Sequence, residues 1–264
     1  LFLLDIALFT PNTSCGVIAH NREDAEKFFS KKIKLAYDHI PSDFKKRYVP
    51  TAVQDAANQL KFSNGSYISV GTSMRSDTLQ YLHLSEYGKL CAKFPEKAAE
   101  VQSGALNAVG VGSTVIIEST AEGAHGHFYD LCTVAKRLAD DDADLSPMDY
   151  KFFFYPWWLA REYRLDNHYE ADEAEARYFK ELAEQSGITL DRQQQNWYIA
   201  KSREQRDKMW REYPSTPDES FRGIIAGAPL SRTMAMLRRN GNITRVPWLR
   251  GHLVHTFCDL GRND

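Results

Sequence analysis

The chain has 264 residues, a formal net charge of −2 and 43% hydrophobic residues. This length suits one large domain or two smaller ones, and the hydrophobic content excludes a globally disordered chain. The near-neutral charge gives no bulk signal for nucleic-acid binding, so a basic surface would have to be local.

The cysteines and the apolar segments exclude several classes of protein. The chain contains Cys15, Cys91, Cys132 and Cys258. They include no Cys-x-x-Cys pair, so they favour a reducing compartment over a zinc site or a disulfide framework. No apolar run approaches the roughly 18 residues that a membrane-spanning helix needs. The apolar start at residues 1–10 contains Asp5 and has no basic leader, so we expect no signal peptide.

The N-terminal half alternates strand and helix patterns, which is typical of an α/β sheet. Residues 14–20 (SCGVIAH) predict a buried strand, and Asn21 follows as the N-cap of a helix that Pro41 ends. Residues 59–70 (QLKFSNGSYISV) predict a hairpin, because Asn64-Gly65 accepts the positive φ of a tight turn.

Further elements follow in chain order. Short apolar runs predict buried strands at residues 79–84, 114–117 and 151–155, and helical patterns occupy residues 94–108 and 127–138.

Beyond an acidic connector that begins near Ala139, the sequence turns helical and highly charged. One helix is expected over residues 168–185, a second from Thr189 or Asp191 to Glu212, and a strand over residues 253–258.

The strand pattern at residues 81–86 (YLHLSE) ends on a group suited to nucleotide hydrolysis. A buried strand there delivers Glu86 to the edge of the sheet, where a carboxylate can position the water that attacks a γ-phosphate. Ser85 stands where a magnesium-holding aspartate is usual, and a hydroxyl holds a magnesium-bound water more weakly. The competing interpretation is a surface glutamate that caps the next helix.

Arg75 lies in a polar loop just before this strand, at residues 71–76. A guanidinium can bind a phosphate in bidentate fashion, either in its own subunit or as an arginine finger in a neighbour. The alternative is an ordinary exposed arginine.

Ser119, Thr120 and Gly123 follow the strand pattern at residues 114–117. Small hydroxyl residues and a glycine turn can contact a γ-phosphate and move when it leaves. The alternative is a strand-to-helix turn with Ser/Thr capping.

Two further groups invite a metal interpretation. Asp259 follows the last strand pattern, a position from which RNase H-like nucleases begin their two-metal site, with Asp264 as a neighbour. His125 and His127 have no third ligand at metal spacing, so packing or capping is favoured for them.

In this order the motifs resemble the large terminase subunit of tailed bacteriophages, the DNA-packaging motor. The matching segments are residues 18–22 (IAHNR), 64–66 (NGS) with Arg75, 82–86 (LHLSE), 119–123 (STAEG) with 127–129 (HFY), 156–158 (PWW), 211–217 (REYPSTP) with Phe221, and 259–261 (DLG). The resemblance extends over nearly the whole chain.

The resemblance implies an α/β fold built on a RecA-like P-loop ATPase core of the additional-strand class, with a mostly parallel sheet. This core would occupy residues 1–150, a helical linker subdomain residues 151–225, and the start of an RNase H-like nuclease domain residues 226–264. The implied cofactors are ATP and Mg²⁺.

It also implies roles for individual residues and partners. Glu86 would be the catalytic glutamate and Arg75 a trans-acting arginine, Ser85 would lie at the nucleotide's magnesium, and Asp259 would bind the nuclease magnesium. Ser119, Thr120 and Gly123 would couple hydrolysis to movement. The partners would be double-stranded DNA, a small terminase subunit and a portal protein. The motor would form a homo-oligomeric ring in the cytoplasm of a bacterial host, away from any membrane.

The sequence departs from the family pattern. It contains no Gly-x-x-x-x-Gly-Lys-Ser/Thr loop, it has Ser85 for aspartate, and the nuclease pattern stops after its first strand. Because it begins without Met and stops just after a strand pattern, we interpret it as part of a longer protein. Alone, these residues are expected neither to hydrolyse ATP at a useful rate nor to cut DNA.

Two rival interpretations remain. A helicase-like RecA-fold ATPase predicts further helicase motifs and a second motor domain. A truncated, non-catalytic prophage remnant predicts that the gene itself starts and stops near these ends.

Overall fold

The computed structural model describes residues 1–74 and 78–222. All of these belong to the first of two compact units, Leu1–Gly223. The predictions made for Arg75, for Asp259 and for a nuclease domain over residues 226–264 therefore lie outside the described residues. The proposed boundary between residues 150 and 151 stays a prediction.

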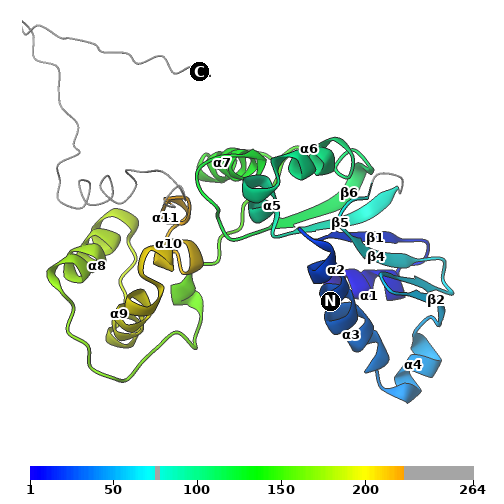
Figure 1. Cartoon of the computed structure of the whole chain (residues 1–264), viewed down its shortest axis with the longest axis horizontal. Helices are drawn as coiled ribbons and strands as arrows, with labels where there is room; N and C mark the ends of the chain where they lie inside the picture. The colour runs from blue at the N-terminus through cyan, green and yellow to red at the C-terminus, as the bar shows by residue number, and fades with distance from the viewer. Residues whose placement is uncertain (75–77, 223–264) are drawn as a thin grey trace, which may run out of the picture. The chain divides into compact units, whose positions relative to one another are not determined.

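Six strands of the described chain form one mixed sheet in the order β2-β3-β4-β1-β5-β6 (Figure 1). Their bounds are β1 Ser14–Ile18, β2 Ala52–Ala56, β3 Gln59–Phe62, β4 Tyr67–Gly71, β5 Leu79–Ser85 and β6 Val109–Glu118. Strands β4, β1, β5 and β6 pair in parallel, whereas β2, β3 and β4 pair antiparallel. The expected α/β architecture is confirmed, and so is the hairpin, with Gly65 at a φ of 82°.

Helices cover both faces of this sheet. Their bounds are α1 Phe2–Phe9, α2 Arg22–Phe28, α3 Leu35–Asp38, α4 Ser42–Tyr48, α5 Tyr87–Lys93, α6 Pro95–Ser103 and α7 His127–Asp140, with a π-helical segment at Phe29–Lys34. Figure 1 shows α1–α3 on one face and α5–α7 on the other. Successive residues of a strand point to opposite faces of the sheet. In β1, Val17 therefore packs into the apolar cluster under α1 and α2, and Ile18 packs into the cluster under α5 and α7.

The C-terminal part of the described chain is helical. It contains α8 Glu173–Ser186, α9 Arg192–Gln205, α10 Met209–Glu212, α11 Pro217–Ser220, and 3₁₀ turns at Trp157–Leu159 and Arg206–Lys208. The expected helix from Asp191 to Glu212 is interrupted at Arg206, whose φ of 51° breaks the helical backbone. The start of α8 lies later than expected because Asp172 and Glu175 form a capping box there.

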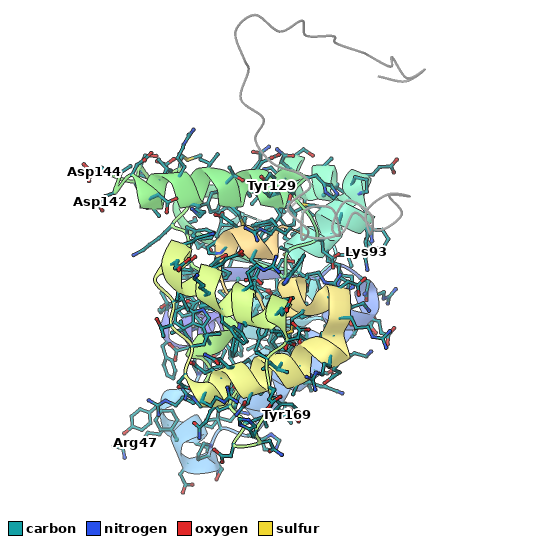
Figure 2. All side chains as sticks on the ribbon, turned by 90° about the vertical axis from the view of Figure 1, so that its left-hand side faces the viewer. Arg47, Lys93, Tyr129, Asp142, Asp144 and Tyr169 are labelled. Atoms are coloured by element: carbon teal, nitrogen blue, oxygen red, sulfur yellow. The ribbon has the colours of Figure 1, made fainter. Side chains whose placement is uncertain are left out.

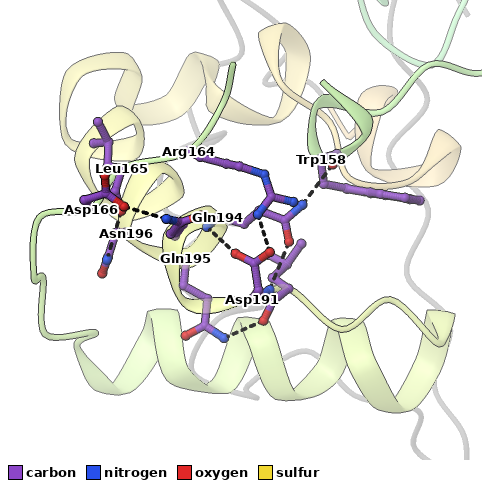
Figure 3. Close-up of polar contacts among 10 residues, drawn as sticks. Trp158, Arg164, Leu165, Asp166, Asp191, Gln194, Gln195 and Asn196 are labelled. Carbon is purple, nitrogen blue, oxygen red and sulfur yellow. Dashed lines mark hydrogen bonds and ion pairs between the residues drawn. The ribbon is translucent and has the colours of Figure 1, made fainter. Parts of the chain in front are cut away.

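Polar side chains at the start of α9 fix the preceding loop, as Figure 3 shows. Asp191 caps the helix, accepting a hydrogen bond from the Gln194 backbone, and also pairs with Arg164. The Gln194 amide donates to the Trp158 carbonyl at 2.9 Å, and Asn196 donates to the Leu165 carbonyl at 3.2 Å. These contacts explain why Gln194 and Asn196 can be buried.

An aromatic core with a buried carboxylate holds this helical part together. Trp157 is buried and stacks on Trp197 with ring centroids 4.9 Å apart. Glu219 is only 3% exposed, and its carboxylate accepts hydrogen bonds from Tyr178 Oη at 2.9 Å and from the Ser215 backbone at 2.7 Å. The Tyr-Pro-Ser-Thr-Pro segment is thereby tied to α8.

One predicted strand is wrong. Residues 151–155 form no strand, and Phe153 and Tyr155 are 62% and 82% exposed. A strand is stable only when a neighbour pairs with its backbone, and no described strand pairs with this segment, so its apolar residues alone do not make one. No helix among residues 1–74 and 78–222 is long and apolar enough to span a membrane.

Candidate functional site

The carboxyl ends of β1, β5 and β6 lie at one edge of the sheet because these strands are parallel. The register pairs Ile18 with Leu84, and Ser85 with Glu118. The residues that follow each strand therefore come together, and this is the edge at which parallel α/β sheets bind ligands. Of the sequence-predicted residues, Ser85, Glu86, Ser119 and Thr120 all lie at this edge.

Glu86 has an unusual backbone for its residue type. It has φ 54° and ψ 40°, which is the left-handed region, directly between β5 and α5. This conformation costs a non-glycine L-residue roughly 1–2 kcal/mol, and such strain concentrates at functional sites. The Glu86 side chain makes no capping hydrogen bond to α5. Glu86 thus occupies the N-cap position of α5, as the competing interpretation predicts, but its carboxylate is not used for capping.

The surroundings of Glu86 favour its protonated form. Burial raises the pKa of its carboxyl group, and the charge of Glu118 raises it further, while Lys89 opposes both. A raised pKa makes the carboxylate a stronger base, which is the property required of a group that accepts a proton from water near neutral pH.

Glu118 is a second carboxylate at this edge, and we did not assign it a role from the sequence. Burial alone would raise its pKa, but His83, the Ser85 hydroxyl and the Glu86 backbone N–H together lower it. His83 Nε2 lies 3.3 Å from Glu118 Oε1, at angles that are not those of a hydrogen bond, and this contact is an ion pair only when His83 carries a proton. Two neighbouring carboxyl groups with pKa values pushed apart are typical of acid–base sites.

Ser119 and Thr120 pack closely against the start of α5. A Cβ atom added to Gly88 would lie 2.9 Å from Ser119 Oγ and 3.0 Å from the Thr120 carbonyl oxygen, so only glycine permits this approach. Ser119 Oγ is buried and has no hydrogen-bond partner among the described residues. An unpaired buried hydroxyl costs stability, which makes it a candidate for contact with a ligand.

The turn after Thr120 does not cap the following helix. Gly126 is the N-cap of α7, and no side chain caps it, so the Ser/Thr-capping alternative is wrong for this turn. Gly123 has a φ of 96°, a left-handed conformation that suits glycine. His127 Nδ1 lies 2.9 Å from the hydroxyl of buried Tyr87, which supports the packing interpretation of this histidine. No group of three potential metal ligands occurs within the described ranges.

The segment after β6 also contacts the helical part of the chain. Arg211 Nη1 lies 3.3 Å from Glu122 Oε2, and both side chains are largely buried. Phe221 packs on Tyr129 with ring centroids 5.0 Å apart. The Arg-Glu-Tyr-Pro and Ser-Thr-Ala-Glu-Gly motifs, far apart in the sequence, therefore meet in the fold.

The sequence contained a signal for some of the residues that we missed. Glu118 ends an apolar run directly before Ser119, just as Glu86 ends the run before α5. This shared pattern predicts that both carboxylates lie at the same edge of the sheet. His83 and Gly88 carry no such signal, because their roles depend on strand register and helix packing. No protein-family model matches the chain, and no curated protein sequence is significantly similar to it.

Proposed function

We propose that the chain is the motor portion of a large terminase subunit, a RecA-like ATPase of the additional-strand class that packages double-stranded DNA. The observation that carries this proposal is Glu86, held in a left-handed conformation at the end of β5 with a raised pKa. The parallel strands of the sheet and the residues at its carboxyl edge support the same assignment.

Each group at the edge has a role in this proposal. Glu86 orients the attacking water and accepts its proton, because burial has made its carboxylate more basic. Glu118 stays ionised, because His83, Ser85 and the Glu86 backbone favour its charged form, and its charge raises the pKa of Glu86. When bound, Mg²⁺–ATP supplies the phosphoryl group and the charge that activates it.

The donor set fits part of such a ligand. Carboxylate and hydroxyl oxygens from Glu86, Glu118 and Ser85 suit magnesium and its bound waters, since Mg²⁺ keeps several waters and takes few protein ligands. The buried, unpaired Ser119 hydroxyl suits a phosphate oxygen. The loop that would hold the β- and γ-phosphates is not among these 264 residues.

One contact favours a terminase over a helicase-like ATPase. Arg211 and Glu122 join two motifs that the resemblance assigns to the linker and to the coupling of hydrolysis with movement. The helicase interpretation gives no reason for these two motifs to meet.

The coding sequence upstream of Leu1 tests the proposal. We expect it to encode a Gly-x-x-x-x-Gly-Lys-Ser/Thr loop after a strand pattern. An upstream reading frame without such a loop would contradict the assignment of an ATPase and favour a non-catalytic remnant.

A further inference from the structure

Three lysines surround His20 beside the candidate site. Lys89 and Lys93 lie one turn apart on α5, and Lys97 follows in the first turn of α6. Burial lowers the pKa of His20, and the charges of all three lysines lower it further, with Asp24 opposing them. All three ammonium groups therefore lie within electrostatic range of one imidazole, and we call Lys89, Lys93 and Lys97 together the lysine surface.

The lysine surface forms no ion pair with any acidic side chain of the described residues. None of the three ammonium groups has an ion-pair partner there, and Lys93 and Lys97 are exposed (Figure 2 labels Lys93). Asp24, the nearest acidic side chain to His20, pairs with that histidine at 3.1 Å. A chain of net charge −2 thus keeps a local positive surface.

The arrangement fits a row of phosphates better than a single nucleotide. Side chains four residues apart on a helix are about 5–6 Å apart at Cβ, so Lys89 and Lys93 lie in a row on α5, and Lys97 follows on α6 after the break at Phe94. Lysine acts as a flexible point charge, which suits successive backbone phosphates without demanding one geometry. The backbone of duplex DNA presents such a line of negative charges.

We propose that the lysine surface binds the phosphate backbone of double-stranded DNA. This inference rests on the proposed function, and it names the face of the motor that contacts its substrate. Because α5 begins directly after Glu86 and Lys89 acts on the charge of Glu86, DNA contact and hydrolysis share one helix.

The test is fluorescence anisotropy with a labelled duplex of about 30 base pairs, titrated between about 50 and 200 mM salt. The variant replaces Lys89, Lys93 and Lys97 with glutamine. The control replaces Lys31, Lys32 and Lys46, three exposed lysines without an ion pair to any described residue, and makes the same change in charge. Circular dichroism and thermal melting of each variant establish that the fold is retained.

We expect the slope of log K against log salt to become shallower by about 2.7 in the lysine-surface variant, because each lysine that no longer neutralises a phosphate lowers the slope by about 0.9. Between 50 and 200 mM salt, the affinity of the variant should therefore fall by a factor roughly 40 times smaller than that of the wild type. The control variant should keep nearly the wild-type slope.

The inference is overturned if the lysine-surface variant keeps the wild-type slope, or if the slope of the control falls as much. It is also overturned if the variant loses binding of Mg²⁺–ATP while its duplex binding is unchanged, since the surface would then hold a nucleotide. If the wild-type chain binds duplex and the variant has the same slope, the inference fails but the proposed function is unaffected. A wild-type chain that binds no duplex contradicts both.

Discussion

Replacing Glu86 with glycine should stabilise the protein. Glu86 occupies the left-handed region at φ 54°, which costs a non-glycine residue roughly 1–2 kcal/mol. Glycine adopts this conformation freely but gains about 0.5–1 kcal/mol of conformational freedom in the unfolded chain. The difference leaves a net stabilisation of up to about 1.5 kcal/mol from the backbone alone.

The carboxyl group adds a part that depends on pH. Its pKa is raised in the folded state, from an ordinary value of 4.5, by burial and by the charge of Glu118. The folded protein therefore binds this proton more tightly than the unfolded chain, and stability falls as pH rises from the ordinary pKa through the raised one. Glu86→Gly escapes this loss, so its advantage over the wild type should widen from acidic to neutral pH.

Urea denaturation at several pH values measures both the backbone contribution and the pH-dependent contribution. The slope m should be the same for wild type and variant. The matched control is Asp142→Gly, because Asp142 is exposed and has a left-handed φ of 48°. The control should be stabilised by the backbone contribution alone, to the same extent at every pH. If Glu86→Gly is no more stable than the wild type at neutral pH while Asp142→Gly is, the strain and burial ascribed to Glu86 are wrong.

Three other substitutions test neighbouring parts of the molecule. Glu118→Gln should lower the pKa of Glu86, read from its carboxyl ¹³C NMR titration, and an unchanged titration would remove Glu118 from the site. Gly88→Ala should cost about 1–3 kcal/mol of unfolding free energy because the added Cβ clashes with Phe128, Ser119 and Thr120; unchanged stability in urea would refute that packing. Tyr178→Phe leaves Glu219 buried with a missing donor, and should cost about 1–3 kcal/mol in the same assay. No loss of stability there would mean that the hydroxyl is not needed.

Local patterns predicted much of the fold because the relevant forces are local. The strand at β1, the Asn21 cap and the hairpin around Gly65 depend on residues within a few positions of one another, and all three are confirmed. Residues 151–155 had the composition of a strand, but pairing with a distant strand decides whether a strand forms. The π-helical segment at Phe29–Lys34 had no sequence signal that we could name.

The candidate site was predicted only in part for a related reason. A strand pattern ending on Glu86 predicted where its carboxylate would lie, because parallel strands end at one edge. The closeness of the Glu86 and Glu118 carboxyl groups depends on the register of β5 with β6, which pairs Ser85 with Glu118 and which no single segment encodes. Gly88 likewise looks like an ordinary helix residue in the sequence, and only the packing of Ser119 explains it.

Magnesium-dependent ATP hydrolysis tests the central claim most directly. The assay compares wild type with Glu86→Gln in the full gene product, in which the proposed function predicts an upstream phosphate-binding loop. If Glu86 is the catalytic base, turnover should fall by about 10²–10⁴-fold while ATP binding is retained. Equal turnover by the two proteins would contradict the proposed role of Glu86. Robust hydrolysis by the 264 residues alone, lost in Glu86→Gln, would instead contradict the expectation that these residues are inactive by themselves.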